Sequence, residues 1–279
     1  MNNISHTHPM VTLASGTQVP VTSFGTSQLR PDEVRPAIAV AVQCGYRMID
    51  TAASYCNEIS VGEAIRSLPN PDEVMISTKV PGRGHGYDEA IRACRDSLDR
   101  LQRDRLDVLM IHWPLPTIGR YVETWRALRT LRDEGLVTTI GVSNFLPEHL
   151  ERIYQETGEW PDLNQIECHP RLWRRGEIAF HERVGIRTQA WSPLAKGGEV
   201  LEHAVVTGIA HRVKRSPGQV ILRWHLQRGV LPIPKSANPQ RIEQNAAITD
   251  FTLTEDDMSS LAVLDVGHWL GPDSRTHLE

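Results

Sequence analysis

The sequence predicts an α/β fold, a (β/α)8 TIM barrel in which eight parallel strands alternate with helices. Two observations predict this fold: eight apolar, β-rich runs recur along the chain, and segments with apolar residues at helical spacing lie between them. A third observation disfavours a doubly wound open sheet, because no GxGxxG motif follows the first run. With 279 residues, of which 40% are hydrophobic, the chain can bury one large core, so we expect a single domain over residues 1–279.

The expected strands and helices follow one another without a break in composition. The eight strands are expected at residues 19–24, 46–50, 74–79, 108–112, 138–142, 163–167, 186–191 and 230–234. Apolar periodicity indicates helices at residues 90–101, 122–131 and 150–154. Glycines stand where helices should end, as expected of C-terminal capping positions: Gly45, Gly135, Gly158, Gly185 and Gly229.

Two additions to the plain barrel are expected. Residues 11–20 predict an N-terminal β-hairpin that turns at Gly16 and closes the bottom of the barrel. Near the other end of the chain, residues 202–214 and 255–264 predict extra C-terminal helices.

Composition and charge exclude several classes of function. A formal charge of -4 with scattered basic residues gives no electrostatic footprint for nucleic acid. The four cysteines form no CxxC pair and show no metal-ligand spacing, so we expect no metal site and a reducing compartment. We find no signal peptide and no apolar run of the roughly 18 residues that a membrane helix needs. A cytoplasmic protein that contacts no membrane is therefore expected.

Four chemically active residues lie at or just past the ends of three neighbouring strand runs: Asp50, Tyr55, Lys79 and His112. In such barrels the active site forms where the carboxyl ends of the strands open into loops. A free phenol has a pKa of about 10, so its ionisation at neutral pH costs on the order of 4 kcal/mol. A neighbouring ammonium favours the phenolate, and a carboxylate keeps that ammonium charged. The four residues therefore predict a site where a tyrosine is the general acid for a carbonyl oxygen.

The motifs that surround these residues resemble the aldo-keto reductases, in family order and spacing from about residue 11 to residue 269. Among the members, the chain is most similar to the bacterial 2,5-diketo-gluconate reductase type. The motifs that carry the resemblance are Asp50-Thr51-Ala52-x-x-Tyr55-x-Asn57-Glu58, Ile76-Ser77-Thr78-Lys79, His112-Trp113-Pro114, Gly141-Val142-Ser143-Asn144, Asn164-Gln165-Ile166-Glu167, Trp191-Ser192-Pro193-Leu194, and Pro234-Lys235-Ser236 with Arg241-Ile242-x-x-Asn245.

The resemblance implies an NADPH-dependent carbonyl reductase, an oxidoreductase that acts on a small-molecule carbonyl substrate. It implies that Tyr55 is the proton donor, that Lys79 lowers the pKa of Tyr55, and that Asp50 pairs with Lys79. His112 is expected to orient the substrate carbonyl. The family also implies a monomer.

The resemblance further implies how the cofactor is held. At the nicotinamide end, three polar side chains are expected to grip the carboxamide and one aromatic ring to stack on it: Ser143, Asn144, Gln165 and Trp191. Along the pyrophosphate, the adenosine 2′-phosphate and the adenine, the expected residues are Ser192, Leu194, Lys235, Ser236, Arg241 and Asn245.

The phosphate assignment also has a basis in the residues themselves. Asn238 and Pro239 are typical of the N-cap and first position of a helix, and a helix N-terminus favours an anion. Lys235 and Arg241 add positive charge and a planar guanidinium fork. The sequence therefore favours NADPH, with NADH as the weaker alternative.

Substrate choice is expected to follow from an opened pocket, because the segment after Asp265 is short. The expected pocket walls are Phe24, Trp113 and Trp269, together with Tyr55. Such a pocket predicts varied small aldehydes, α-keto aldehydes or diketones as substrates.

Two alternative functions stay open at this point. A strand-end lysine in a barrel can form a Schiff base with a carbonyl substrate, so Lys79 also fits a lyase. The second alternative is a non-catalytic NADPH-binding barrel that regulates a partner protein.

Overall fold

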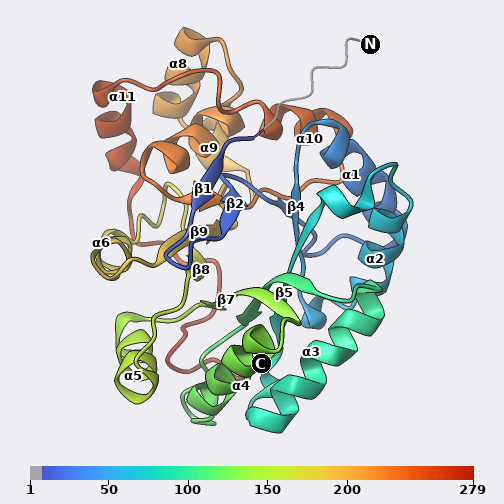
Figure 1. Ribbon diagram of the computed structural model, residues 1–279. Helices are drawn as coiled ribbons and strands as arrows, with labels where there is room; N and C mark the ends of the chain where they lie inside the picture. Colours follow the sequence, from blue (N-terminus) through green and yellow to red (C-terminus); the bar gives the residue numbers. More distant parts are fainter. Residues whose placement is uncertain (1–7) are drawn as a thin grey trace.

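The protein is an eight-stranded parallel barrel, seen in a computed structural model that describes residues 8–279. The strands neighbour one another in chain order, and Figure 1 shows the helices arranged around them. The barrel strands are β3 (Phe24–Gly25), β4 (Met48–Asp50), β5 (Met75–Val80), β6 (Leu106–Ile111), β7 (Val137–Ser143), β8 (Leu163–Glu167), β9 (Arg187–Trp191) and β10 (Leu231–Pro232). The predicted TIM barrel is confirmed. The prediction of a single domain over residues 1–279, whose first seven residues lie outside the described ones, stays a prediction.

Hydrogen bonds between the first and last strands close the barrel. The Ser23 amide donates to the carbonyl of Pro232 at 3.3 Å, and the Gly25 amide donates to the carbonyl of Pro234 at 3.0 Å. The Thr22 hydroxyl adds a bond of 2.9 Å to Pro232. Because both edges of the sheet are paired in this way, backbone groups at the seam are satisfied without a flanking element.

A helix follows each barrel strand, and the extra helices stand near the predicted residues. The barrel helices are α1 (Pro31–Gln43), α2 (Glu58–Arg66), α3 (Tyr87–Leu101), α4 (Tyr121–Asp133), α5 (Pro147–Thr157), α6 (Arg175–Val184), α9 (Pro217–Gln227) and α10 (Pro239–Ala246). The extra helices are α7 (Glu199–Glu202), α8 (Ala204–Val213) and α11 (Glu255–Ser260), with a 3-10 turn at Leu261–Leu264. Within residues 8–279, no helix is long and apolar enough to span a membrane.

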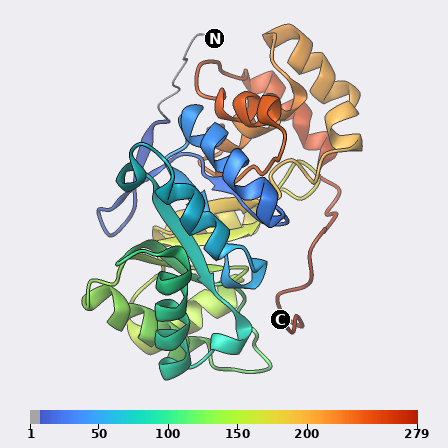
Figure 2. The same cartoon turned by 90° about the vertical axis from the view of Figure 1, so that its right-hand side faces the viewer.

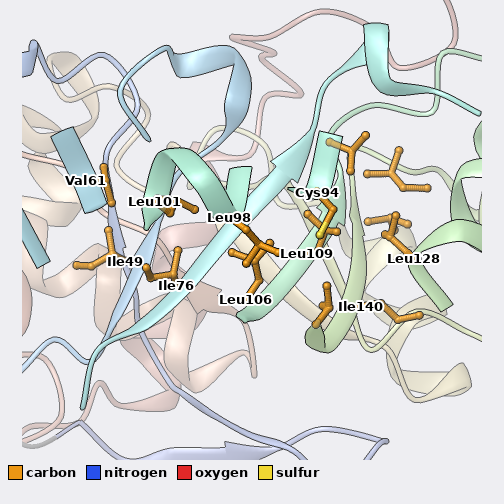
Figure 3. Close-up of a cluster of buried hydrophobic side chains, with 14 of the residues drawn as sticks. Ile49, Val61, Ile76, Cys94, Leu98, Leu101, Leu106, Leu109, Leu128 and Ile140 are labelled. Carbon is orange, nitrogen blue, oxygen red and sulfur yellow. The ribbon is translucent and has the colours of Figure 1, made fainter. Parts of the chain in front are cut away.

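The outer core lies between the helices and the strands, and α3 shows why the sequence folds this way. Ala90, Cys94, Leu98 and Leu101 recur at helical spacing and are all buried. Figure 3 shows Cys94, Leu98 and Leu101 among side chains of the strands β5 and β6. Each large apolar side chain buried in this layer contributes about 1.5–3 kcal/mol, which offsets the entropy lost on ordering the helix.

The predicted hairpin is confirmed, but the predicted first strand at residues 19–24 is wrong in its bounds. Strand β1 (Met10–Thr12) pairs antiparallel with β2 (Gln18–Pro20), and Gly16 at the turn has a φ of +86°. Val19 is fully buried against the start of the barrel, in a cluster with Met48 and Leu163. The hairpin therefore covers the barrel bottom. Val19 belongs to β2 of the hairpin and packs at the barrel bottom, so the first barrel strand begins only at Phe24, after the chain has turned.

The five predicted capping glycines end their helices. Gly45, Gly135, Gly158, Gly185 and Gly229 have φ values of +102°, +78°, +73°, +82° and +69° and follow α1, α4, α5, α6 and α9. This left-handed conformation suits glycine because it has no Cβ, so each helix stops where the chain turns back to the next strand.

Two buried histidines make the fold sensitive to acid. Burial lowers the pKa of His181 to about 3 and the pKa of His225 to about 3. His181 accepts a bond from the Asn164 amide at 2.9 Å and lies 2.8 Å from the Thr188 hydroxyl, so a second proton has no acceptor there. Both side chains are neutral in the folded protein, and both gain a proton in the unfolded chain near pH 6.5.

We predict that the free energy of unfolding decreases as the pH is lowered below about 6.5. In this range the unfolded chain binds more protons than the folded protein. Each of the two histidines contributes a slope of up to about 1.4 kcal/mol per pH unit. Urea unfolding between pH 7 and about 5, where carboxylates remain ionised, measures this slope. The His181→Gln variant should show a slope that is smaller by up to about 1.4 kcal/mol per pH unit. A stability that does not change across this range contradicts the prediction.

Candidate active site

The structure brings the four predicted catalytic residues to one end of the barrel. Asp50 ends β4, and Tyr55 closes the 3-10 turn Ala53–Tyr55 that follows. Lys79 lies in β5, and His112 comes directly after β6. Because β4, β5 and β6 are parallel neighbours, their carboxyl ends meet at the same rim of the barrel.

A buried ion pair lies at the centre of this group. The Lys79 ammonium donates to Asp50 Oδ1 at 2.7 Å and to the carbonyl of Thr51 at 2.8 Å. Asp50 Oδ2 accepts from the Ser77 hydroxyl at 3.2 Å and from the Gln165 amide at 2.9 Å. Lys79 is 1% exposed and Asp50 is 3% exposed. Burial opposes the charge on Lys79, but its interactions with the Asp50 carboxylate and with Tyr55 together outweigh burial and raise the pKa of Lys79.

Tyr55 lies beside this pair, with its ring centroid 5.3 Å from the Lys79 ammonium. The sequence predicts that Lys79 lowers the pKa of Tyr55. In the structure the ammonium acts in that direction, but burial outweighs it and raises the pKa of Tyr55 above its ordinary value. The phenol therefore keeps its proton at neutral pH, which is the state that a general acid needs before it reacts.

His112 lies next to Tyr55 and has an ionisable partner that sequence reasoning missed. The two rings meet edge to face, with centroids 5.9 Å apart. His112 Nδ1 lies 2.7 Å from a carboxylate oxygen of Glu279 and 3.1 Å from the Ser54 hydroxyl. Glu279 is 167 positions away along the chain, and no motif or periodicity connects the two. The contact depends on the path of the chain after the barrel.

A cavity of about 850 Å3 extends from Tyr55 and His112 along the rim to α10. This volume is in the range of binding sites for large small-molecule ligands. Lys79 lies behind the cavity wall rather than on it. All ten residues predicted to hold the cofactor line this one cavity: Ser143, Asn144, Gln165, Trp191, Ser192, Leu194, Lys235, Ser236, Arg241 and Asn245.

At the inner end of the cavity, polar side chains hold one another in place. The Ser143 hydroxyl donates to the carbonyl of Gln165 at 2.9 Å, and the Asn144 amide donates to the carbonyl of His112 at 3.0 Å. The indole of Trp191 donates to Asn144 Oδ1 at 2.8 Å. Asn144 has a left-handed φ of +65°. In this conformation its side chain contacts both His112, which follows β6, and Trp191, which ends β9. These groups form a preorganised polar surface beside the Trp191 ring.

The outer end of the cavity is positively charged. Lys235, Arg241 and Lys196 line it, and no carboxylate within residues 8–279 forms an ion pair with any of the three. The predicted N-cap is present, because the Asn238 side chain accepts from the Arg241 amide at 3.1 Å. A helix N-terminus with unpaired cations beside it is suited to a phosphate group.

Several residues of this cavity were not predicted. Lys196 lies in a loop where Ala195, Lys196 and Gly197 all have positive φ values, and Ser216, Pro217 and Gly218 form the N-terminus of α9. The Ser216–Gln219 capping box is a sequence signal for that helix start. No comparable local signal marks Ser27 and Gln28, which reach the cavity because the chain bends after β3.

Two of the predicted pocket walls do not reach the cavity. Trp113 lines it, but Phe24 and Trp269 do not. Phe24 is 1% exposed and packs against Tyr46, because the pleat of β3 directs its side chain outward to the helices. Trp269 is 44% exposed and covers the guanidinium of Arg174, with the ring centroid 4.3 Å from Cζ.

The short segment after Asp265 reaches the rim of the site, and the expected open pocket stays a prediction. The segment of residues 267–279, which we call the crossing segment, runs back over the barrel rim. Figure 2 shows it as an extended red trace along one side of the molecule. Near its end, His277 packs on Trp113 with ring centroids 4.3 Å apart. A short segment is long enough to reach the site because it is extended rather than looped.

Comparison with known proteins places this geometry in a family. Residues 21–265 match the model of the Aldo/keto reductase family. The chain is 43% identical over 272 residues to 2,5-diketo-D-gluconic acid reductase B of Corynebacterium sp., covering 97% of this chain and 98% of the relative. It is 41% identical over 266 residues to methylglyoxal reductase DkgA of Escherichia coli, covering 95% of this chain and 96% of the relative.

Solved structures agree with this comparison. A mutant of Gox0644 in complex with NADPH superposes with a TM-score of 0.93 at 41% identity, covering 98% of this chain and 99% of the other. An aldo-keto reductase of Bombyx mori in complex with NADP superposes with a TM-score of 0.89 at 32% identity, covering 96% of each chain.

The buried pair at the centre of the site generates a prediction about stability. Asp50→Asn leaves the Lys79 ammonium without its counter-charge, so we expect a loss of about 3–5 kcal/mol. The double variant Asp50→Asn with Lys79→Met removes both charges and should be more stable than Asp50→Asn alone. Urea unfolding of four proteins, the wild type, Asp50→Asn, Lys79→Met and the double variant, measures the effect. Additive losses from the two substitutions contradict the interpretation of the pair as a mutually dependent unit.

Proposed function

This chain belongs to the aldo/keto reductase family, and we propose on that basis that it reduces carbonyl groups with NADPH and that Tyr55 is its general acid. It is an oxidoreductase that acts on carbonyl compounds and uses NADP(H). The observation that carries the proposal is one continuous cavity with a buried Lys79–Asp50 pair and Tyr55 at one end and unpaired cations at the other.

The cavity residues fit a phosphorylated dinucleotide. Lys235, Arg241 and Lys196 would hold its phosphates. The amide and hydroxyl groups that line the inner end offer both donors and acceptors for a carboxamide. Trp191 would lie against the flat ring. The chemistry that NADPH supplies when bound is a hydride for the substrate carbon. NADH stays the weaker alternative, because its adenosine lacks the phosphate for Arg241.

Tyr55 is suited to donate a proton to the substrate oxygen for two separate reasons. Burial keeps the phenol protonated before the reaction, since it raises the pKa of Tyr55. The Lys79 ammonium then stabilises the phenolate that forms as the proton leaves. Asp50 keeps this ammonium charged and fixed, so Lys79 meets the developing negative charge without rearrangement.

The substrate carbonyl would lie with its oxygen between Tyr55 and His112. Negative charge develops on this oxygen during reduction, and hydrogen-bond donors placed there in advance stabilise the transition state more than the substrate. His112 is held by its contacts to Ser54 and Glu279, so its ring does not need to reorient when a substrate enters.

The two alternatives are less consistent with the geometry. A Schiff-base lysine must be neutral and reachable, whereas Lys79 is fully buried, bonded to Asp50 and kept charged. A regulatory barrel does not need a general acid beside a buried ammonium, yet the four catalytic positions are complete and adjacent. A partner-regulating role therefore has no observation of its own in this structure.

We further propose small aldehydes, α-keto aldehydes or diketones as substrates. Support comes from the relatives named for diketogluconic acid and methylglyoxal and from the Trp113 wall of the cavity. A monomeric, cytoplasmic protein belongs to the same proposal. Its basis is the family resemblance and the four free cysteines.

We predict that Tyr55→Phe lowers kcat for aldehyde reduction by roughly 100- to 10,000-fold, the usual contribution of general acid catalysis. The affinity for NADPH should be unchanged, because the ring is retained and only the hydroxyl is lost. Loss of NADPH absorbance with an aldehyde panel measures the first effect, and fluorescence titration measures the second. A variant that keeps its kcat contradicts the assignment of Tyr55 as the acid.

We predict that Arg241→Ala raises the Kd for NADPH by roughly ten- to a hundredfold, because a charge-assisted bond contributes about 1.5–3 kcal/mol. The Kd for NADH should change little, since NADH lacks the extra phosphate. Arg35→Ala is the matched control, because Arg35 is exposed on α1 and does not line the cavity. Equal losses for both nucleotides contradict the phosphate assignment.

A further inference from the structure

The crossing segment is fixed at its start by a buried carboxylate. Glu167, which is 2% exposed at the end of β8, accepts from the amides of Leu270 at 2.6 Å and Gly271 at 2.9 Å. Gly271 lies so close to Trp191 that an added Cβ would stand 2.6 Å from the indole. The segment therefore begins tightly packed on the aromatic residue of the cofactor cavity.

The same segment ends at the substrate side of the site. Glu279 Oε1 lies 2.7 Å from His112 Nδ1, and Glu279 Oε2 accepts from the amide of Gly82 at 2.9 Å. Gly82 begins the Gly82–Gly84 turn after β5. An added Cβ at Gly82 would stand 2.6 Å from Leu115 and 3.3 Å from the Cβ of Glu279, so this turn is shaped to receive Glu279 closely.

The Glu279 carboxylate is ionised at neutral pH. Burial opposes its ionisation, but the hydrogen bond and charge of His112, with the hydrogen bonds from Gly82 and Ser54, together outweigh burial and hold the pKa of Glu279 below its ordinary value. An ionised carboxylate can only accept hydrogen bonds, so the hydrogen between the two side chains belongs to His112 Nδ1. His112 can then donate through Nε2 to a substrate oxygen only when the imidazole carries hydrogens on both nitrogens.

We propose that Glu279 is a positioning residue for catalysis, which fixes the imidazole of His112 through Nδ1 and supplies the counter-charge that lets Nε2 donate a hydrogen bond to the substrate oxygen. The proposal deepens the proposed function and rests on it. No covalent step is involved, and Glu279 acts only through His112.

The other charged groups near His112 do not take this role. The Lys79 charge is compensated by Asp50, and Arg120 is paired with Glu89 and Glu123. Burial lowers the pKa of His85 to about 4 and also lowers the pKa of His277, so both are neutral at neutral pH. Tyr55 keeps its proton. Among the groups that the structure places around His112, Glu279 is therefore the carboxylate in direct contact.

Glu279→Gln tests the proposal, because the amide keeps the shape and removes the charge. Reduction of 4-nitrobenzaldehyde with NADPH is measured at about pH 6 and about pH 8. We expect kcat of Glu279→Gln to fall roughly tenfold below the wild-type value at the higher pH. At the lower pH we expect a much smaller loss, because the higher proton concentration compensates for the missing counter-charge. The Kd for NADPH should not change.

Two control variants separate this role from simple packing. His277→Ala removes the contact with Trp113 and tests how well the segment is held, and Asp273→Asn removes a negative charge from the same segment at a residue paired with Arg275. Neither should produce a pH-dependent loss of kcat. A loss in Glu279→Gln that is equal at both pH values, or that His277→Ala reproduces, overturns the proposal. So does a rise in kcat, which would mean that Glu279 blocks the site.

An NMR measurement decides the pairing without turnover. The Nδ1–H proton of His112, assigned by its absence in His112→Gln, should appear at low field in the wild type and move in Glu279→Gln. No such signal in the wild type overturns the proposal. If the wild type reduces no carbonyl compound at all, the proposed function fails, while the His112 signal still shows whether Glu279 holds the imidazole.

Discussion

The buried ion pair between Lys79 and Asp50 is the interaction on which the rest of the site depends. Two charges without solvent are stable only when each has partners, and here Thr51, Ser77 and Gln165 supply the remaining hydrogen bonds. Thr51 follows β4, and Ser77 and Gln165 lie in β5 and β8, so the pair connects opposite sides of the barrel. The same bonds fix the Gln165 amide at the cavity wall. One hydrogen-bond network around Lys79 and Asp50 therefore compensates the buried charges and also fixes part of the cavity wall.

The network supports the proposed role of Tyr55 as a general acid, although its phenol is hard to ionise. Burial raises the pKa of Tyr55, which keeps the proton in place until a substrate arrives. The nearby ammonium favours the phenolate that remains after proton transfer. Because the ammonium cannot move or lose its charge beside Asp50, its effect is available in the transition state without reorganisation. Burial therefore accounts for the protonated resting state of Tyr55, and the Lys79 ammonium accounts for the stabilisation of the phenolate.

The sequence predicted the parts of the structure that local chemistry determines. Strand ends, capping glycines and the Asn238 cap depend on a few adjacent residues, and the barrel topology brings Asp50, Lys79 and the ten cavity residues together. The failures have a different cause. The side-chain direction of Phe24 depends on where β3 begins, and this was obscured by Val19, which packs in the hairpin. The Glu279 contact depends on the path of an irregular segment, for which no periodicity exists.

Ultraviolet difference titration of the wild type against Tyr55→Phe tests the central claim most directly, because it follows the ionisation of this one phenol. The account predicts that the cofactor-free protein shows no Tyr55 phenolate until the pH exceeds about 10, the ordinary value for a phenol. A phenolate that appears near neutral pH would contradict it. That result would mean that the Lys79 ammonium, rather than burial, determines the resting state of Tyr55.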